Sequence, residues 1–432
     1  MTTPQTLTII PTFWTKPDSD GSRRTRERTR RDTGSSSGGE AFYTHPTPLD
    51  EENPPLLRML ESLRRVRDLG RIAILVYAAN SSLEVRADER VRELVRDFED
   101  LDIFVVGPSE RGSLYRRLEQ LDMGFLVPAL KQPGYGSARN LGLIAAAAMN
   151  ADVAVMLDDN EVIENANFLE TALYGMGETF EDGTPLLGKT GYCVDERGRW
   201  ECEVTEDFTD IFWPRASTFN DAMRRMLKAP RLQQARMACG GIMALHHDLY
   251  TRVAFDPWIR RGEDTDYVIN ARMHGYSIFS DDEWSIVKPT RAVSEHALLF
   301  KQDAERFVYK HRKIEFTKSQ VDLRQVDPKA LNPFPGTFID SGIGWRAFAT
   351  GCLKLIKSKD RIGYFNAGRT ALTSAAKYAA ENCANYCTFQ RAWAQLMAVV
   401  GEDVTFEPLL FDDGDGDRAA LTGQFRAITR TH

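Results

Sequence analysis

The segment at residues 153–160, VAVMLDDN, carries the strongest chemical signal in the sequence, because an apolar run ends there in two acids and an amide. Acidic side chains at the end of a buried strand project into the adjoining crevice, where their oxygens suit a hard divalent cation such as Mg²⁺ or Mn²⁺. Asp158, Asp159 and Asn160 are therefore candidate ligands. The alternative is a helix cap or a turn, which uses the same residue types.

A glycine-containing segment, KQPGYGSARN at residues 131–140, precedes this acidic group. Its glycines permit close backbone approach, and Ser137 is positioned to cap the helix that follows. The amides of a helix N-terminus favour anions, and Arg139 adds a bidentate donor for phosphate. Taken alone, one glycine-rich loop carries little information, so Gly136 and Arg139 are candidates only together with the acids.

Two later groups offer proton transfer and a further metal ligand. In RGEDTDY, residues 261–267, Glu263 and Asp264 fall at or before the first turn of an expected helix. A carboxylate there can act as a general base on a hydroxyl, although acids at this position also favour the helix dipole. His296 ends VSEH at 293–296 and is able to complete a metal site, whereas a lone histidine is more often structural.

The elements that must position these groups alternate between strands and helices. The strands are expected at residues 7–10, 72–77, 103–106 and 153–157, and the helices at 54–69, 83–98, 114–121 and 137–149. Such alternation indicates an α/β fold with a mostly parallel sheet, whose ligands bind at the carboxyl ends of the strands. Residues 11–13, 78–80 and 158–160 should therefore surround one site, with Pro11 ending the first strand.

Two domains are expected from a length of 432 residues, because a single core rarely serves so long a chain. The α/β domain is assigned to residues 1–300 and a helical C-terminal domain to 301–432, where alanine-rich runs such as 371–380 favour helices. Residues 15–50, rich in Arg, Ser and Gly, bury too little apolar surface to order themselves and predict a mobile loop. The alternative is an arginine flap over an anionic substrate.

The composition limits the classes of protein to consider. A net charge of −7 argues against a dedicated nucleic-acid binder, which needs a basic surface. No apolar run approaches the ~20 residues that span a bilayer, and the N-terminus lacks the features of a secretory signal. We therefore expect a soluble, cytoplasmic protein with six reduced cysteines. Peripheral contact with a membrane and the oligomeric state are left open.

Taken in order, these motifs resemble the GT-A glycosyltransferases, most closely the inverting family 2, over about two thirds of the chain. The matching segments are IIPTF at 9–13, GSARNLG at 136–142, MLDDN at 156–160, GGIMA at 240–244, RGEDTD at 261–266 and EH at 295–296. In the family, these correspond to the strand end at the nucleotide base, a glycine-alanine-arginine-asparagine turn, the metal-binding acids, an acceptor-side segment, the motif with the base and a late histidine.

The resemblance implies a GT-A domain that moves a sugar, typically a hexose, from a nucleoside diphosphate sugar to an acceptor hydroxyl. Asp264 would be the base, beside Glu263, which gives inversion. Asp158, Asn160 and His296 would hold the Mg²⁺ or Mn²⁺. The implied donor-binding residues are Pro11, Thr12, Phe13, Asn80, Gly136, Arg139, Asp158 and Asp159. One departure is Asn160, which stands where the family has aspartate and would bind a hard cation more weakly.

Three other functions remain open on these residues. A retaining GT-A enzyme of the glycosylglycerate-synthase kind also uses a late histidine on the metal, although Glu263 and Asp264 favour inversion. A nucleotidyltransferase shares the α/β plan but usually carries a glycine-rich first turn, which residues 11–16 lack. A non-catalytic sugar-nucleotide-binding protein is the third, because Asn160 weakens the acidic motif.

Overall fold

The computed structural model describes most of the chain. The described residues are 4–17, 46–204, 207–228, 230–239, 241–289 and 296–411. Of the segment expected to be a mobile loop or an arginine flap, 15–50, residues 18–45 lie outside these ranges, whereas Thr15, Thr47 and Pro48 at its two ends are in strands. Gly240 and Glu295 of the motifs above also lie outside the described ranges.

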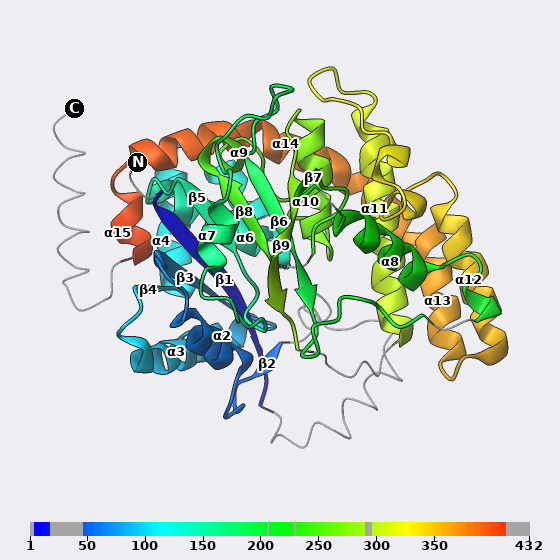
Figure 1. Cartoon of the computed structure of the whole chain (residues 1–432), viewed down its shortest axis with the longest axis horizontal. Helices are drawn as coiled ribbons and strands as arrows, with labels where there is room; N and C mark the ends of the chain where they lie inside the picture. Colours follow the sequence, from blue (N-terminus) through cyan, green and yellow to red (C-terminus); the bar gives the residue numbers. More distant parts are fainter. Residues whose placement is uncertain are drawn as a thin grey trace.

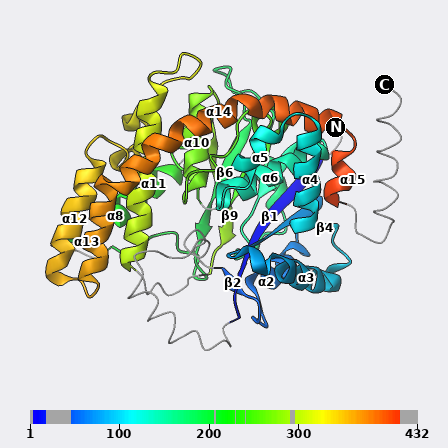
Figure 2. The same ribbon diagram turned by 180° about the vertical axis from the view of Figure 1, so that it is seen from behind.

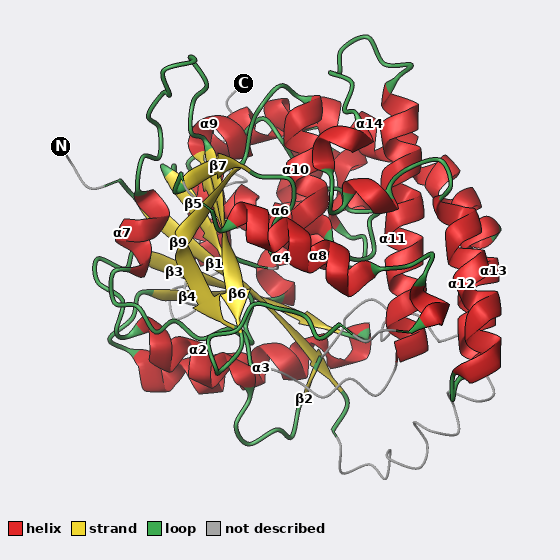
Figure 3. Ribbon diagram, turned by 45° about the vertical axis from the view of Figure 1, so that its right-hand side comes forward, coloured by secondary structure: helices red, strands yellow, loops and turns green. Residues whose placement is uncertain are grey.

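Within these ranges, nine strands form a single sheet (Figure 1 and Figure 3). They are β1 (Thr6–Thr15), β2 (Thr47–Pro48), β3 (Arg71–Ala78), β4 (Ile103–Val106), β5 (Val153–Met156), β6 (Gly188–Val194), β7 (Leu232–Gln234), β8 (Met243–His246) and β9 (Phe279–Val287). The order is β4-β3-β1-β5-β8-β6-β9-β7, with β2 beside β1. The β8 strand is antiparallel to both of its neighbours and β7 is antiparallel to β9, whereas the other pairs are parallel.

Helices cover both faces of the parallel part of the sheet. They are α2 (Pro55–Leu63), α3 (Glu84–Val95), α4 (Pro108–Gln120), α5 (Val127–Leu130) and α6 (Tyr135–Ala148). Along β1, Leu7 and Ile9 pack in one core with α4 and α6, and Ile10 packs in the other core with α2 and α3. All ten residues of β1 are buried, as expected for a parallel strand covered on both sides.

The first strand does not end at Pro11, contrary to the sequence prediction. It continues to Thr15 and pairs with β3 beyond the proline, where Pro11 lies opposite Leu75. The carbonyl of Ile9 accepts from Leu157 on the β5 side, and alternate residues of a strand face the same side. The missing N–H of Pro11 therefore faces the side on which β5 has already ended, so it breaks no ladder bond.

Two helices begin earlier than expected, because their first turns are polar. The α4 helix starts at Pro108 rather than near residue 114, and Glu110 accepts from the Gly107 N–H at 2.9 Å to complete its N-terminus.

The remaining helices of this half are α7 (Phe168–Leu173), α8 (Arg215–Met226), α9 (His247–Tyr250) and α10 (Glu263–Met273). The α10 helix starts one turn before Tyr267, so the acids of RGEDTD form its first turn.

The C-terminal part is helical. It comprises α11 (His296–Thr317), α12 (Ile343–Lys357), α13 (Arg361–Leu372), α14 (Ser374–Glu402) and α15 (Phe406–Phe411). The alanine-rich run 371–380 is not one helix, because the chain breaks at Thr373 between α13 and α14. Figure 2 shows α14 crossing the back of the α/β part, where Trp393 donates to the Tyr250 carbonyl at 2.8 Å. The expected boundary near residue 300 falls inside α11.

The structure thus confirms an α/β fold with a mostly parallel sheet and a helical C-terminal extension, as the GT-A resemblance implies. All six cysteines are free thiols. Among the described helices, none combines the length and the apolar character that crossing a bilayer requires.

Candidate active site

Asp158 lies just beyond the carboxyl end of β5 and is held by two cationic side chains. Arg139 Nη2 donates to its Oδ1 at 2.9 Å, and Lys288 Nζ donates to its Oδ2 at 2.7 Å. Arg139 comes from α6 and Lys288 follows β9, so three elements converge here. Arg139 and Asp158 were both predicted at the donor site, without a contact between them, and Lys288 was not predicted.

Glu161 is a second buried acid that the sequence analysis did not select. Its Oε2 accepts from the Asp158 backbone N–H at 2.9 Å, and its Oε1 lies 3.2 Å from Lys288 Nζ. Gly241 makes room for this group: its φ is +91°, and a Cβ there would lie 2.7 Å from Asp158 Cγ and 2.9 Å from Glu161 Oε1. A side chain at this position would therefore collide with the acids.

Burial and the neighbouring charges shift the pKa values of Asp158, Glu161 and Lys288. Burial opposes ionisation of Asp158, but Lys288 and Arg139 outweigh it and lower the pKa of Asp158 to about 2. Burial raises the pKa of Glu161 to about 7 despite its contact with Lys288. The carboxylates of Asp158 and Glu161 in turn outweigh burial for Lys288 and raise its pKa. Asp158 is therefore ionised and Lys288 charged at neutral pH.

Arg139 joins this acidic group to the start of α10. Its Nε donates to Glu263 Oε1 at 2.9 Å while its Nη2 donates to Asp158, and the side chain is only 1% exposed. The third nitrogen, Nη1, is buried and has no hydrogen-bond partner among the described residues. A buried guanidinium N–H without a partner is costly, so it favours an oxygen-rich ligand or a water at this point.

Asp264 follows Glu263 but differs from it in exposure. Glu263 is buried and burial raises its pKa, whereas Asp264 is partly exposed and accepts from the Thr265 N–H at 2.6 Å. The two neighbouring carboxylates thus differ in their surroundings: Glu263 is bonded to Arg139, whereas Asp264 is partly open to solvent.

The helical extension supports the loop that leads into α10. Lys310, on α11, donates to the Gly262 carbonyl at 2.8 Å, and burial lowers the pKa of Lys310 to about 8. Lys313, one turn on, binds both Asp256 and Asp266 in the protein interior. These ion pairs attach the segment around Asp264 to α11 rather than leaving it as a free loop.

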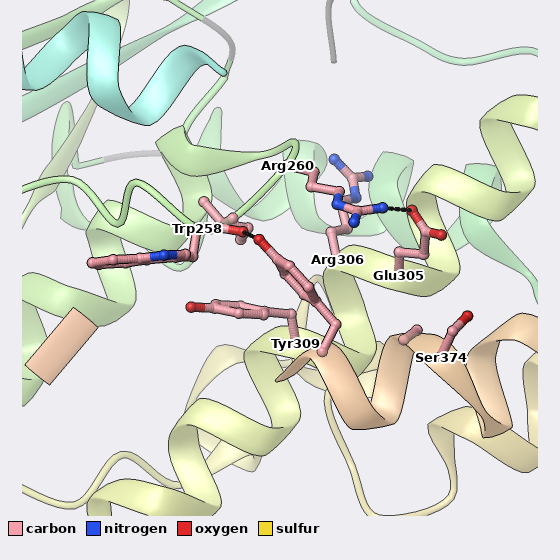
Figure 4. A pocket seen from close by; sticks show the side chains of 9 residues that line it. Trp258, Arg260, Glu305, Arg306, Tyr309 and Ser374 are labelled. Carbon is pink, nitrogen blue, oxygen red and sulfur yellow. Dashed lines mark hydrogen bonds and ion pairs between the residues drawn. The ribbon is translucent and has the colours of Figure 1, made fainter. Parts of the chain in front are cut away.

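A small cavity of about 60 Å³ lies next to the same loop. Figure 4 shows Trp258 and Arg260 on the loop, Arg306 and Tyr309 on α11, and Ser374 at the start of α14 around it. It is too small for a nucleotide sugar, since ligand pockets usually exceed about 300 Å³. We therefore regard it as a packing gap between the loop and the extension.

The residues expected at the nucleotide lie in the second half of β1 and just after β3. Thr12 Oγ1 donates to Asp159 Oδ2 at 2.7 Å, which links β1 to the acidic segment. Phe13 stacks on Tyr77 with 5.6 Å between the ring centroids and meets Tyr135 at 4.7 Å. The interior of β1, not a loop after it, therefore supplies Pro11, Thr12 and Phe13.

Asn80 and Gly136, expected at the sugar donor, and Ser137, expected as a helix cap, each have a local structural role. Asn80 caps the short 3₁₀ helix at Ser81–Leu83, accepting from the Ser82 N–H at 3.0 Å. Gly136 is required because a Cβ would lie 2.3 Å from the Asp256 carbonyl oxygen. Ser137 does not cap α6, contrary to expectation, because it lies inside the helix and its hydroxyl donates to the Ala129 carbonyl at 3.4 Å.

His296 lies in a different setting from the acids. It is exposed at the start of α11 and lines a cavity of about 800 Å³, whose other walls include Trp213, Arg215, Asp303 and Lys354. Asp303 is engaged there, because Arg215 Nε lies 2.5 Å from it. None of Asp158, Asp159 and Asn160 lines this cavity.

The predicted metal ligands do not form a ligand group in this structure. Both oxygens of Asp158 are occupied by cationic side chains, and His296 lines another cavity. The Asn160 Oδ1 atom is buried without a hydrogen-bond partner in the described part of the chain, as a ligand oxygen could be. Across those same residues, no three histidine, cysteine, aspartate or glutamate side chains lie close enough to hold a metal ion.

Comparisons with known proteins give distant similarity only. No family model matches the chain, and no curated protein matches it. Among solved structures, a mannosyltransferase from Pyrobaculum calidifontis in complex with GDP-Man and Mn²⁺ is 13% identical, with a TM-score of 0.46, over 92% of this chain and 87% of that one.

Two further solved structures are similar at lower scores. A mycobacterial protein is 13% identical with a TM-score of 0.35, over 71% of this chain and 74% of that one. GalNAc-T7 with UDP, GalNAc and Mn²⁺ is 12% identical with a TM-score of 0.38, over 79% of this chain and 56% of that one. At these scores the similarity carries no argument about function, which has to be argued from the site itself.

Proposed function

We propose that this protein is a glycosyltransferase that uses a nucleoside diphosphate sugar and an acceptor hydroxyl. The observation that carries the proposal is the bridge made by Arg139. A single buried guanidinium links Asp158, at the carboxyl end of β5, to Glu263, next to Asp264, and its Nη1 has no partner among the described residues. A nucleoside diphosphate sugar at the strand ends would supply an anionic acceptor for Nη1 and would lie close to both Asp158 and Asp264.

The donor would lie along the carboxyl edge of the sheet. Thr12 and Phe13 are suited to the nucleoside, since Phe13 belongs to a cluster of three aromatic rings. Arg139 is suited to the diphosphate, and the N-terminus of α6 that contains Gly136 adds favourable backbone dipoles. Asp159 would be oriented by its bond from Thr12. Asn80 would meet the base from the end of β3.

The acceptor hydroxyl would be deprotonated by Asp264. This carboxylate is partly exposed at the first turn of α10, and its buried neighbour Glu263 is already committed to Arg139. A base on the acceptor side and a leaving diphosphate near Arg139 correspond to direct displacement at the sugar carbon with inversion. A hexose is the proposed transferred group, as in the enzymes that the motifs resemble.

A divalent cation, Mg²⁺ or Mn²⁺, is expected from the resemblance. The predicted metal ligands do not lie together in a group that could bind it. Asp158 already has two cationic partners, and His296 lines another cavity. We therefore assign no step to a metal. The dependence on a metal has to be measured separately from the transfer reaction.

Thermal unfolding in the presence of a panel of nucleotide sugars tests the proposal, because a ligand that binds the native state raises its stability. We expect one donor to stabilise the protein and to be turned over with a suitable acceptor, with inversion of the anomeric configuration by NMR. Retention would support the glycosylglycerate-synthase kind of mechanism. Binding without turnover on any acceptor would support a non-catalytic sugar-nucleotide-binding protein, and stabilisation by none of the donors would overturn the proposal.

A further inference from the structure

The hairpin formed by α12 and α13 presents large apolar side chains to the outside of the molecule. Trp345, Ile356 and Ile362 are 68%, 64% and 73% exposed. Figure 1 and Figure 2 both show this hairpin at the end of the molecule opposite α15, away from the sheet. Isolated exposed apolar residues are ordinary, but a contiguous group on one face needs an explanation.

We call five apolar side chains of α12 and α13 that are exposed or half-buried the hairpin face: Trp345, Phe348, Ile356, Ile362 and Phe365. Along α12, the first three recur at spacings of three and eight residues, which places them on one side of the helix. The rings of Trp345 and Phe348 lie 6.1 Å apart, and those of Phe348 and Phe365 lie 6.1 Å apart across the hairpin. The hairpin face is therefore shared by both helices.

The hairpin is also basic, in a chain whose net charge is −7. Residues 343–372 contain six basic residues and one acid, a net charge of 6 − 1 = +5. The basic residues are Arg346, Lys354, Lys357, Lys359, Arg361 and Arg369. The one acid, Asp360, is used to cap α13, accepting from the Gly363 N–H at 2.9 Å.

Part of this charge is available for a partner. Lys354 and Lys357 pair with Asp210 and Asp207. Lys359, Arg361 and Arg369 are exposed. In the described ranges these three make no ion pair. Lys359 and Arg361 lie at the turn between the helices, beside Ile356 and Ile362 in the sequence, so free positive charge borders the apolar face.

We propose that the hairpin face docks on an anionic lipid surface. Apolar and aromatic side chains next to free lysine and arginine are the combination that binds the interface of a negatively charged bilayer. The acyl region receives the apolar groups, and the phosphates of the headgroups attract the basic side chains. A second copy of this chain is a poorer partner, because two surfaces of the same charge would be brought together.

Flotation with lipid vesicles tests the proposal on the full chain. Vesicles of phosphatidylcholine alone are compared with vesicles that also contain phosphatidylserine, at low and raised ionic strength. We expect binding to the anionic vesicles only, weakened by salt. The combined variant Trp345→Ser, Ile356→Ser, Ile362→Ser and the charge variant Lys359→Glu, Arg361→Glu should each lower the bound fraction at least about tenfold.

Matched controls are available elsewhere on the surface. Phe125 is 63% exposed and the Lys318 side chain is 52% exposed, so Phe125→Ser and Lys318→Glu remove comparable groups outside the hairpin and should bind like the wild type. Thermal unfolding of all variants checks that they are folded. A second readout is the fluorescence of Trp345, obtained as the difference between the emission of the wild type and that of Trp345→Phe. This emission should shift to shorter wavelength when anionic vesicles are added.

Three results would overturn the proposal. The first is a wild-type chain that fails to float with anionic vesicles. The second is unchanged binding by both hairpin variants. The third is a wild-type dimer in solution that the serine variant converts to a monomer, which would assign the face to a second copy of the chain.

Discussion

Arg139 and Asp158, nineteen residues apart in the chain, are joined by a 2.9 Å bond between Nη2 and Oδ1 at the carboxyl edge of the sheet. The same guanidinium holds Glu263, 124 residues further along. Two motifs that the sequence treats as separate therefore share one side chain, and the site depends on that side chain for its shape.

Replacing Arg139 should separate its effect on protein stability from its effect on binding of the sugar donor. In Arg139→Met the buried carboxylates lose their common partner, and removing one member of a buried ion pair costs about 3–5 kcal/mol. Arg139→Lys keeps the charge but cannot reach both acids in the same geometry, so it should destabilise less and still bind the donor poorly. Urea unfolding and titration calorimetry measure the two effects. A stable Arg139→Met chain with normal donor affinity would contradict the proposed bridge.

Asp264→Asn should abolish transfer while leaving donor binding intact. The amide cannot accept the acceptor proton, and loss of a general base typically slows a reaction by about 10²–10⁴-fold. Glu263→Gln is the matched comparison, because it weakens the bond to Arg139 and should lower donor affinity instead. Comparable turnover by purified Asp264→Asn would remove this residue as the base.

Lys288→Met should change the response of the site to a divalent cation. In the wild type, the Lys288 ammonium lies between Asp158 and Glu161 and occupies the place that a cation shared by the two acids would take. Without it, two carboxylates are left close together and a dication can replace the lost charge. We expect Mn²⁺ to bind at least about tenfold more tightly to the variant in calorimetry. Equal affinity in both chains would mean that the lysine does not compete with a metal.

Lys310 gives the stability of the protein a measurable dependence on alkaline pH. Burial lowers its pKa from 10.5 in the unfolded chain to about 8 in the native protein. Between these values the native state has lost a proton that the unfolded state keeps, so the free energy of unfolding rises with pH. Below pH 8 both states are charged and the native state carries the full penalty.

The test compares the wild type with Lys310→Met from pH 7 to pH 10.5. The difference in free energy of unfolding between the two chains should shift in favour of the wild type by about 3 kcal/mol at most over that range. Lys318→Met, which alters an exposed lysine, is the control. A constant difference between wild type and Lys310→Met would show that this group does not titrate in the window.

Local patterns were enough to predict the elements that position the site. The apolar run before Asp158 is β5, the glycine-containing segment precedes and enters α6, and the acids of RGEDTD start α10. These predictions depend on the periodicity of apolar residues and on glycine, proline and acidic residues at the ends of helices and strands, all within a few residues. For the same reason the strand order was out of reach, because β8 enters between β5 and β6 from a distant part of the chain.

Lys288 shows why the composition of the site was only partly predictable. It follows a strand, as Asp158 does, and that shared position is the signal that could have paired the two. A lone lysine gives no indication of which strand end it will face, since that depends on the pairing of β6 with β9. His296 was selected by its order in the motifs, and order along the chain does not determine distance in space.

The path of α14 behind the α/β part has a practical consequence for anyone dissecting this chain. Its buried residues Phe389, Trp393, Leu396 and Met397 belong to the same core as Leu7 and Ile9 of the first strand. A fragment that stopped after the last strand would display that core to water and should aggregate. The tail has to be expressed with the α/β part, so function cannot be assigned to either piece by truncation.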